Sequence, residues 1–393
     1  MVLGHIAVVG ASLAGLRTAE ALRRHGYQGE LTLIGAEPHF PPYDRPPLSK
    51  AVLTGAPPER LRAPGEAELG AKLRLGVAAV GLDLAARQVH LADGERLGFD
   101  GLVIATGVAP RQPAALRGAP PEVFVLRTLE DALALRAALL RGPRVAVVGG
   151  GFIGCEIAAA CRALGLEVTV VEADEQPLRR VLGPRMGREL AALHRDHGTA
   201  LRTGTPVAGL RPGRVLLADG TEVPADVVVL AIGCAPATGW LRGSGLDLTD
   251  GVLLDERCAA VGARGVVAAG DVARWPHPLF GETLRIEHWT NAVEQADAAA
   301  RTLLAGPGGT AEPYAAVPYF WSEQYGTKIH FVGRATGRPR VVEGSPAERR
   351  FVAVWTRAGV VCGALCVNRA GRLARYRRLI ANRATEEELP TVP

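Results

Sequence analysis

The chain has 393 residues, which is too long for one ordinary domain and long enough to bury two or three separate cores. Charged residues make up 22% and hydrophobic residues 48% of it, values typical of globular proteins that favour neither disorder nor a membrane protein. The net charge of +5 either favours an acidic protein partner through electrostatic steering or reflects an arginine-biased genome, and we expect no nucleic-acid partner.

The N-terminus predicts no secretory signal, because Met1 to His5 leads directly into a short apolar run that ends in glycine. The longest apolar run, around 227–232, is far shorter than a membrane span. The six cysteines include no C-x-x-C pair. We therefore expect a cytoplasmic protein with reduced, structural thiols and no membrane association.

The first predicted element is a dinucleotide-binding unit. An apolar strand runs into the glycine segment 10–15, a helix-compatible stretch follows, and a second strand at 31–34 ends near Glu37. Glycines let the backbone approach a pyrophosphate, whose charge meets N–H groups at the helix N-terminus, while the acid accepts hydrogen bonds from ribose hydroxyls. Ser12 replaces the usual middle glycine; it removes some room but keeps a small side chain that can hydrogen-bond to phosphate.

A proline-rich polar loop, Tyr43-Asp44-Arg45-Pro46-Pro47-Leu48-Ser49-Lys50, follows this unit. Further on, Asp93-Gly94 predicts a hairpin turn. It precedes a buried strand at 102–104 that stops at Ala105-Thr106-Gly107.

From residue 147 the chain repeats itself. Val147-Val148-Gly149-Gly150-Gly151-Phe152-Ile153-Gly154 echoes the first glycine segment, and the strand at 168–171 runs directly into Glu172. The turn Asp219-Gly220 and a strand that stops at Gly233 echo the later part of the first copy. The sequence therefore predicts two related dinucleotide-binding domains.

The acid of the second copy bears on nucleotide preference. Glu172 would repel the 2'-phosphate of NADPH, so it favours NADH. Arg179 and Arg180 are the residues that would overturn this preference.

After the second copy, a short strand at 265–269 ends in Gly270-Asp271, and a helix is predicted over 291–304. We expect both to complete the first domain. Gly306-Pro307-Gly308-Gly309 then breaks the chain. Strands are predicted at 318–321, at 328–332 and over 351–367 around an Ala358-Gly359 turn, followed by a basic helix over 372–383.

The predicted fold class is thus α/β, with two Rossmann-like domains and a small α+β C-terminal domain. We expect a discontinuous first domain at 1–110 and 235–305, a second domain at 111–234, and a C-terminal domain at 306–393.

At this point the sequence resembles the FAD/NAD(P)-dependent pyridine nucleotide reductases, in particular the putidaredoxin reductase-like ferredoxin reductases that serve bacterial Rieske-type dioxygenases and haem-thiolate monooxygenases. The resemblance covers essentially the whole chain. Its marks are the loop 43–50 and Ala105-Thr106-Gly107, with Gly270-Asp271-Val272-Ala273, Glu287-His288-Trp289 and Pro318-Tyr319-Phe320-Trp321-Ser322.

The resemblance implies FAD on the first domain and NADH on the second. For FAD it implies Gly10, Ser12, Leu13, Ala14, Gly15, Glu37, Arg45, Lys50, Ala105, Thr106, Gly107, Gly270, Asp271, Trp289 and Trp321. For NADH it implies Gly149, Gly151, Phe152, Ile153, Gly154, Glu172 and Gly233.

Two residues are implied in catalysis. The Lys50 ammonium, near flavin N5 and N1, would stabilise negative charge as the ring accepts a hydride. Glu156 would pair with Lys50 and line the nicotinamide site, although an acid in the first turn of a helix is also favoured by the helix dipole alone. Trp289 and Trp321 are either flavin neighbours or ordinary core aromatics. His288 stays outside the catalytic set, and no metal site is predicted.

What the sequence lacks narrows the reaction. Disulfide reductases of this kind need cysteines after the first glycine-acid unit, and the segment 37–53 has none. No cysteine cluster would hold an iron-sulfur centre within the chain. Electrons therefore have to leave the flavin directly, most simply as single electrons to an external carrier.

We thus predict an NADH-dependent ferredoxin reductase whose acidic 2Fe-2S ferredoxin docks transiently and serves an oxygenase. Arg372, Arg375, Arg377 and Arg378 form a basic cluster suited to that partner. Alternatives are an NADH oxidase, a reductase of rubredoxin or another carrier, and a redox-sensing flavoprotein resembling apoptosis-inducing factors. We expect a monomer or a weak homodimer. The particular ferredoxin and oxygenase are not encoded in any visible motif, and Cys362 and Cys366 have no predicted function.

Overall fold

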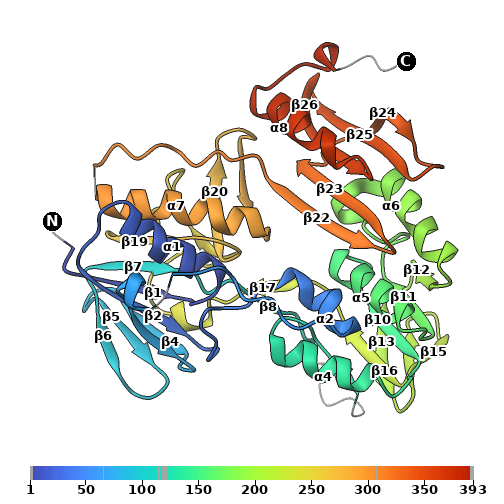
Figure 1. Ribbon diagram of the computed structural model, residues 1–393, viewed down its shortest axis with the longest axis horizontal. Coiled ribbons are helices and arrows are strands. Elements are labelled where there is room, and N and C mark those ends of the chain that lie inside the picture. The colour runs from blue at the N-terminus through green and yellow to red at the C-terminus, as the bar shows by residue number, and fades with distance from the viewer. Residues whose placement is uncertain (1–2, 65, 114–115, 117–121, 307, 390–393) are drawn as a thin grey trace. The chain divides into compact units, whose positions relative to one another are not determined.

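The computed structural model describes residues 3–64, 66–113, 116, 122–306 and 308–389 (Figure 1). The chain forms two compact units. Unit 1 comprises 1–43, 60–109 and 235–318, and unit 2 comprises 44–59, 110–234 and 319–393.

Unit 1 is built on a five-stranded parallel sheet with the order β19-β7-β1-β2-β3. Its apolar strands are almost wholly buried, as is typical of a parallel sheet that is covered on both faces. The strands are β1 (His5–Val9), β2 (Glu30–Gly35), β3 (Lys72–Leu75), β7 (Gly101–Ile104) and β19 (Val266–Ala268). Because β19 pairs with β7, the late segment returns to the first sheet, as predicted.

Unit 2 holds a second parallel sheet with the order β12-β11-β10-β16-β9. Read from the other edge, the first sheet has the same plan, with β1 matching β10, β2 matching β11 and β7 matching β16. The predicted repeat is therefore a repeat of structure. The strands are β9 (Val123–Phe124), β10 (Val145–Val148), β11 (Val168–Glu172), β12 (Ala200–Thr203) and β16 (Val227–Leu230).

Each copy also carries a three-stranded antiparallel sheet. The predicted Asp-Gly turns join its second and third strands, with Gly94 and Gly220 at φ of +91° and +84°. The strands are β4 (Ala79–Asp83), β5 (Gln88–Leu91) and β6 (Arg96–Gly98) in unit 1, and β13 (Val207–Arg211), β14 (Arg214–Leu217) and β15 (Glu222–Pro224) in unit 2.

The C-terminal part of unit 2 is a five-stranded antiparallel sheet with the order β22-β23-β26-β25-β24, and helix α8 (Leu373–Ala381) packs on β26 and β23. The strands are β22 (Tyr319–Gln324), β23 (Thr327–Gly333), β24 (Arg340–Ser345), β25 (Arg350–Arg357) and β26 (Val360–Val367). The sequence did not indicate β24, because this edge strand is short, contains a bulge and lies among glycines and charged residues. The predicted α+β C-terminal fold is confirmed.

Helices cover the sheets of both units. They are α1 (Leu13–Arg24) and α7 (Trp289–Ala305) in unit 1, and α4 (Leu129–Leu139), α5 (Phe152–Ala163) and α6 (Arg179–Asp196) in unit 2. Short elements complete the fold: η1 (Pro46–Ser49), α2 (Ala51–Thr54), α3 (Glu66–Leu69), η3 (Gly239–Leu241), η4 (Ala370–Arg372) and η5 (Glu386–Glu388), with strands β8 (Val108–Pro110), β17 (Cys234–Pro236), β18 (Val252–Leu253), β20 (Ala273–His277) and β21 (Glu282–Arg285).

The loop that carries Arg45 and Lys50 groups with unit 2, although the predicted first domain includes it. The physical reason is local packing, since η1 and α2 lie against α4 and α5. Conversely, the residues from 306 to Pro318 group with unit 1, although the predicted C-terminal domain includes them.

Among the described residues, no helix combines the length and the apolar character needed to cross a membrane.

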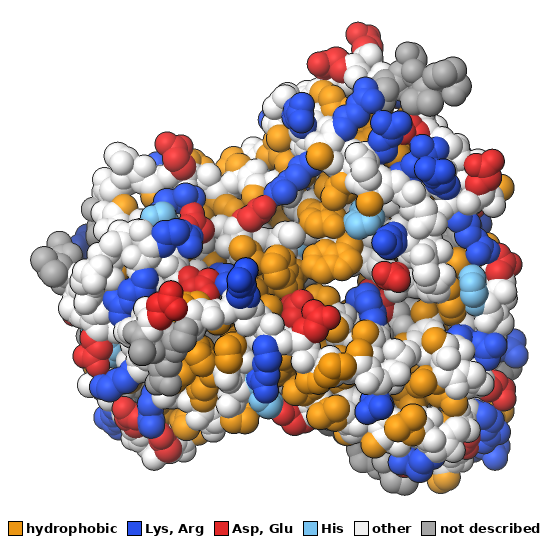
Figure 2. Space-filling model, viewed as in Figure 1, with side chains coloured by type: hydrophobic (Ala, Val, Ile, Leu, Met, Phe, Trp, Pro, Cys, Tyr) orange, Lys and Arg blue, Asp and Glu red, His pale blue; other side chains and the backbone are white. Residues whose placement is uncertain are grey.

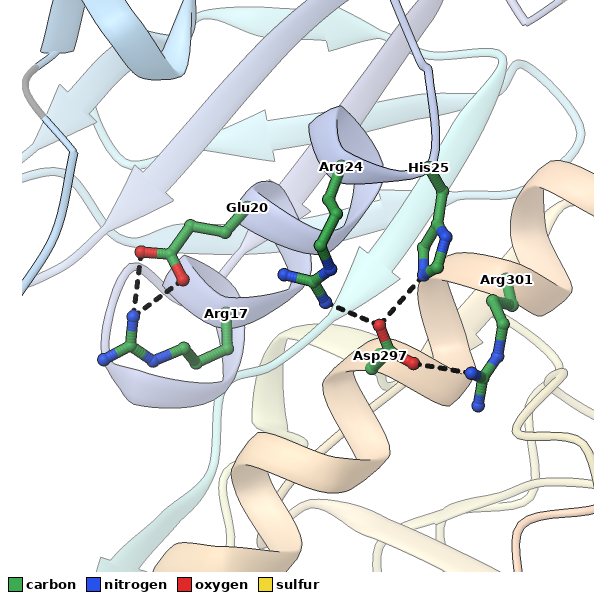
Figure 3. A network of polar contacts seen from close by, with 6 residues as sticks. All are labelled: Arg17, Glu20, Arg24, His25, Asp297 and Arg301. Carbon is green, nitrogen blue, oxygen red and sulfur yellow. Dashed lines mark hydrogen bonds and ion pairs between the residues drawn. The ribbon is translucent and has the colours of Figure 1, made fainter.

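Helices α1 and α7 pack closely through buried alanines and are joined at one end by charge. The carboxylate of Asp297 accepts from Arg24 at 2.6 Å and contacts the His25 Nε2 atom at 2.9 Å, and it pairs with Arg301 at 2.8 Å (Figure 3). Partial burial alone would raise the pKa of Asp297, but the hydrogen bonds from His25 and Arg24 and the charge of Arg301 lower it overall.

We predict that Asp297→Asn destabilises unit 1. The loss at pH 7 is about 0.5–1 kcal/mol, because the arginines are half exposed and solvent screens them. The folded pKa is depressed, so this stability is present above the unfolded value of about 4 and fades as the pH falls through the folded value. Thermal unfolding at pH 7 and at about pH 3 checks this: the difference from wild type has to shrink at the lower pH.

The matched control is Glu20→Gln, which removes an ion pair within α1 alone. Equal melting temperatures for wild type and Asp297→Asn at pH 7 would contradict the role of the network.

Candidate functional site

The first glycine segment joins β1 to α1 by two close backbone approaches. Gly10 has φ +113°, and a Cβ atom there would lie 2.2 Å from the carbonyl oxygen of Ala105. A Cβ atom on Gly15 would lie 1.7 Å from the carbonyl oxygen of Gly10. Since real Cβ contacts are never this short, both positions require glycine for the fold itself.

The second segment repeats this geometry between β10 and α5. Gly149 has φ +108°, and its Cβ atom would lie 2.3 Å from the carbonyl oxygen of Ala231. The Cβ atom of Gly154 would lie 2.0 Å from the carbonyl oxygen of Gly149. The outer glycines of both copies thus serve the strand-to-helix packing.

The middle glycine differs in kind. A Cβ atom on Gly151 would meet nothing within 4 Å, and Gly151 has no positive φ. This open space lies at the N-cap of α5, and Ser12 occupies the same place at the N-cap of α1. The fold therefore tolerates Ser12, and the missing glycine of the first copy affects only the room for a ligand.

The first turns of α1 and α5 suit an anionic group. The first intrahelical bonds run from Leu16 N to the Ser12 oxygen and from Cys155 N to the Gly151 oxygen, so the N–H groups of 13–15 and 152–154 precede them. Neither first turn contains an acid. A glycine turn, open space and N–H groups at a helix N-terminus fit a dinucleotide pyrophosphate in each copy.

The side chains of the first two residues of α5 lie in different environments. Phe152 packs edge-on against Phe320, with ring centroids 4.6 Å apart, whereas Ile153 is 48% exposed. The N–H groups of both residues, rather than their side chains, match the predicted contact with the pyrophosphate.

The two predicted acids lie beside their glycine segments in different ways. Glu172 ends β11 and accepts from the N–H of Gly150 at 2.7 Å and of Asp174 at 2.8 Å. Glu37 lies two residues beyond β2 and accepts a hydrogen bond from the hydroxyl of Tyr43. Both carboxylates are half buried at the carboxyl ends of strands, where ribose recognition requires them.

The strand ends predicted to line the first site converge on its glycine segment. Ala105 and Thr106 follow β7 and lie against Gly10. Gly270 follows β19, and its Cβ atom would lie 2.9 Å from the Cβ atom of Ala14 in α1. Asp271, the next residue, is therefore near the start of α1. Gly107 and Gly233 end the matching strand segments at φ +67° and +87°.

The tryptophans separate into two groups. Trp240, Trp275 and Trp355 are buried core residues. Trp289, at the start of α7, and Trp321, on β22, are only partly buried. The core interpretation therefore does not hold for these two, which leaves them as candidates for ring contacts with a ligand.

The central feature of unit 2 is an ion pair between the partly buried Lys50 and the buried Glu156. The ammonium of Lys50 donates to Glu156 Oε2 at 2.7 Å, and Glu156 is 3% exposed. This confirms the predicted pairing. Lys50 also donates to the carbonyl oxygen of Pro46 at 2.9 Å.

Two serines complete the surroundings of Glu156, and sequence reasoning did not identify them. Ser49 Oγ donates to Glu156 Oε2 at 2.5 Å, and Ser322 Oγ donates to Oε1 at 2.6 Å. Both serines belong to the motifs Tyr43 to Lys50 and Pro318 to Ser322, so the signal was present but their target was not visible. A buried carboxylate with several donors is suited to remaining charged.

Arg45 is engaged elsewhere in unit 2. Its guanidinium donates to the carbonyl oxygen of Arg127. Its predicted contact with a phosphate of FAD therefore stays a prediction.

Five of the six cysteines are buried core residues, and Cys234 is partly buried. All six are free, and burial raises the pKa of the Cys161 and Cys366 thiols to about 12. Burial also raises the pKa of the Cys155, Cys258 and Cys362 thiols. Such thiols stay protonated and unreactive at neutral pH. Across the described part of the chain, no group of His, Cys, Asp and Glu side chains is arranged to hold a metal ion.

The two kinds of glycine lead to a prediction. Gly154→Ala should destabilise unit 2 by about 1–3 kcal/mol or more, because its methyl group overlaps the Gly149 carbonyl. Gly151→Ala should leave stability within about 0.5 kcal/mol of wild type. If this copy binds NADH, as the resemblance implies, the variant should weaken that binding at least tenfold, because its methyl group would fill the space expected for the pyrophosphate. Thermal unfolding and NADH titration separate the two effects, and equal NADH affinity in Gly151→Ala would contradict this account.

The chain matches two family models. Residues 4–296 match the model described as pyridine nucleotide-disulphide oxidoreductase, and residues 319–389 match the one described as reductase C-terminal.

Curated relatives and solved structures agree with this result. The chain is 38% identical over 406 residues to the ferredoxin--NAD(+) reductase component of the p-cumate 2,3-dioxygenase system of Pseudomonas putida, with 100% of this chain and 98% of the relative covered. It is 34% identical over 398 residues to putidaredoxin reductase of Pseudomonas putida, with 98% and 93% covered. The covalent complex of putidaredoxin reductase with putidaredoxin superposes with a TM-score of 0.90 at 33% identity, covering 97% of this chain and 93% of that chain.

The resemblance indicated by the motifs is thus confirmed, and the chain belongs to the pyridine nucleotide-disulphide oxidoreductase family, whose ferredoxin reductases use FAD and NAD(H).

Proposed function

We propose that the chain is an NADH-dependent ferredoxin reductase that passes electrons from NADH, through FAD, to a 2Fe-2S ferredoxin of a Rieske dioxygenase or a haem-thiolate monooxygenase. The observation that carries this proposal is the pair of dinucleotide folds combined with a loop at 37–53 that contains no cysteine. Full-length similarity to ferredoxin reductase components supports it.

We assign FAD to the first predicted domain, 1–110 with 235–305, and NADH to the second, 111–234. The glycine segments of the two copies would hold the pyrophosphates, Glu37 and Glu172 the ribose hydroxyls, and Asp271 the ribityl chain. When bound, FAD would accept two electrons as a hydride and release them as single electrons.

The chain's own residues supply position and charge. Lys50 would place a positive charge where hydride transfer builds up negative charge on the ring. Glu156 anchors that ammonium, since the two groups lie 2.7 Å apart and the carboxylate is buried. Arg45 would reach a phosphate of FAD, and Trp289 and Trp321 would shape the ring pocket.

The nucleotide preference follows from charges near Glu172. Arg180 donates to Asp174 at 2.6 Å, and Arg179 pairs with Glu175. Both arginines thus have carboxylate partners, and neither stands ready for a 2'-phosphate. This supports NADH over NADPH.

Free cysteines fit a reducing compartment, so we place the enzyme in the cytoplasm, as a monomer or a weak homodimer.

The proposed reductase activity is tested in the absence of oxygen. FAD-loaded protein is reduced with NADH and then mixed with an oxidised 2Fe-2S ferredoxin, while cytochrome c reports the onward electrons. We expect cytochrome reduction that depends on ferredoxin, with kcat/KM at least tenfold higher for NADH than for NADPH. Rapid reduction by NADH with no transfer would contradict the ferredoxin assignment and point to oxygen, rubredoxin or a sensing role.

The partner surface is proposed on α8. Arg375 and Arg378 are exposed there, and Figure 2 shows Lys and Arg side chains gathered over the C-terminal elements. Arg372 is exposed as well, and its Nε atom lies 2.9 Å from the buried Glu343 carboxylate, so it also serves the fold. An exposed basic surface of this kind suits an acidic ferredoxin.

We predict that the double variant Arg375→Glu with Arg378→Glu raises the KM for ferredoxin about tenfold at low salt, because like charges now oppose docking. At about 0.5 M salt the difference should shrink through screening. The control is Arg242→Glu with Arg264→Glu, at two exposed positions of unit 1. An unchanged KM at low salt would exclude this surface.

A further inference from the structure

A file of polar side chains, joined one to the next by hydrogen bonds, leads away from Glu156 inside unit 2. Its members are Ser322, Gln324, His194, Tyr325 and Thr199. Gln324 Nε2 lies 3.1 Å from Ser322 Oγ, and Gln324 Oε1 lies 3.0 Å from His194 Nε2. On the other side of the His194 ring, the file continues to Tyr325. The Tyr325 hydroxyl lies 3.1 Å from His194 Nδ1 and 2.6 Å from the Thr199 hydroxyl. Gln324 and His194 are 0% exposed, and Ser322 and Thr199 are 2% exposed.

The charge of Glu156 fixes the direction of every bond in this file. An ionised carboxylate has no proton, so Ser322 must donate to it and can then only accept from Gln324. Gln324 therefore turns its NH₂ group to Ser322 and its oxygen to His194. His194 must then be protonated on Nε2, which leaves Nδ1 to accept from Tyr325.

The surroundings of His194 agree with this assignment. Burial lowers the pKa of His194 to about 4, so the ring is neutral at physiological pH and has one donor and one acceptor nitrogen. Burial also raises the pKa of Tyr325 to about 12, so its hydroxyl keeps the proton that it donates. All the donors thus point toward Glu156.

Tyr325 is held in place at a conformational cost. It forms, with Gly326, the two-residue turn between β22 and β23, and its φ of +52° is one that aromatic residues rarely adopt. Its ring stacks on His197, with centroids 4.2 Å apart. The turn of the C-terminal sheet is thus anchored on the end of α6 and on Thr199.

The file is not a proton path. Gln324 lies in its middle, and an amide does not readily accept a proton at one end and release one at the other. A fixed chain of donors instead orients each group that it touches.

We propose that Gln324, His194 and Tyr325 are positioning residues for the Lys50–Glu156 pair, because they hold the Ser322 hydroxyl in the one orientation that donates to Glu156. The inference deepens the proposed function, since it explains how the C-terminal sheet keeps the charged pair aimed and ionised. It places these residues outside direct contact with the reacting atoms.

The first test determines the direction of the hydrogen bonds in the file and does not require enzyme turnover. Nitrogen-15 NMR of histidine-labelled protein, with His194→Gln to identify the signal, should show His194 neutral with its proton on Nε2. In Tyr325→Phe, the Nδ1–H form should appear as well, because nothing then donates to Nδ1. A wild-type ring protonated on Nδ1 would reverse the file and overturn the proposal.

The second test measures anaerobic flavin reduction by NADH between pH 5.5 and 8. The groups that face Glu156 are Lys50, Ser49 and Ser322, with the neighbouring Cys155 thiol; those that face His194 are Gln324, Tyr325 and His197. Cys155 stays protonated across this range, since burial raises the pKa of its thiol. The variants are compared with wild type and with a matched control across this range.

We expect Gln324→Met to lower the reduction rate about tenfold at pH 5.5 and less than about twofold at pH 8, which is the effect of weakening one hydrogen bond to a charged group. Tyr325→Phe should act in the same direction, but less. The control is Tyr376→Phe, which removes a buried tyrosine hydrogen bond, to Glu343, in the same sheet domain. Profiles for Gln324→Met that match those of Tyr376→Phe would reject the positioning role.

The proposed function and the positioning role can fail separately. Wild-type protein that NADH does not reduce would refute the proposed function, while the NMR result would still decide the direction of the file.

Discussion

The contact on which the rest of this molecule depends is the approach of a helix to the strand before it, made possible by one glycine facing the carbonyl of another. Gly15 against Gly10 and Gly154 against Gly149 leave no room for a Cβ atom. This closeness fixes where α1 and α5 begin and turns their first N–H groups toward the ends of the strands. Both proposed dinucleotide sites follow from these two contacts.

The second constraint is the cost of burying the charge of Glu156. A carboxylate that is 3% exposed needs a counter-ion and donors, and it takes them from distant segments: Lys50 and Ser49 from the loop at 43–50, and Ser322 from β22. These bonds tie the loop and the C-terminal sheet to α5 within unit 2. The group proposed to serve catalysis is thus also the group that organises its surroundings.

Local patterns predicted much of this. The twin sheets, the Asp-Gly turns and the return of β19 follow from short motifs whose physics is local, and the Lys50–Glu156 pair followed from a family resemblance. Ser322 lies in a recognised motif, but its partner Glu156 is 166 residues away and was not visible. Gln324, His194 and Tyr325 were out of reach, because they belong to no distinctive motif and His194 is likewise distant from the other two in the sequence. The Arg372–Glu343 pair was out of reach for a related reason: Glu343 lies on β24, a strand that the sequence did not indicate.

The central claim is that FAD is the redox group of this chain and that no thiol takes part. An anaerobic reductive titration of FAD-loaded protein with dithionite tests it most directly, since it counts the electrons stored for each flavin. The account predicts that reduction is complete after a single electron pair and that the thiol count does not change. Uptake of a second electron pair, with new thiols appearing, would reveal a redox-active disulfide and contradict it.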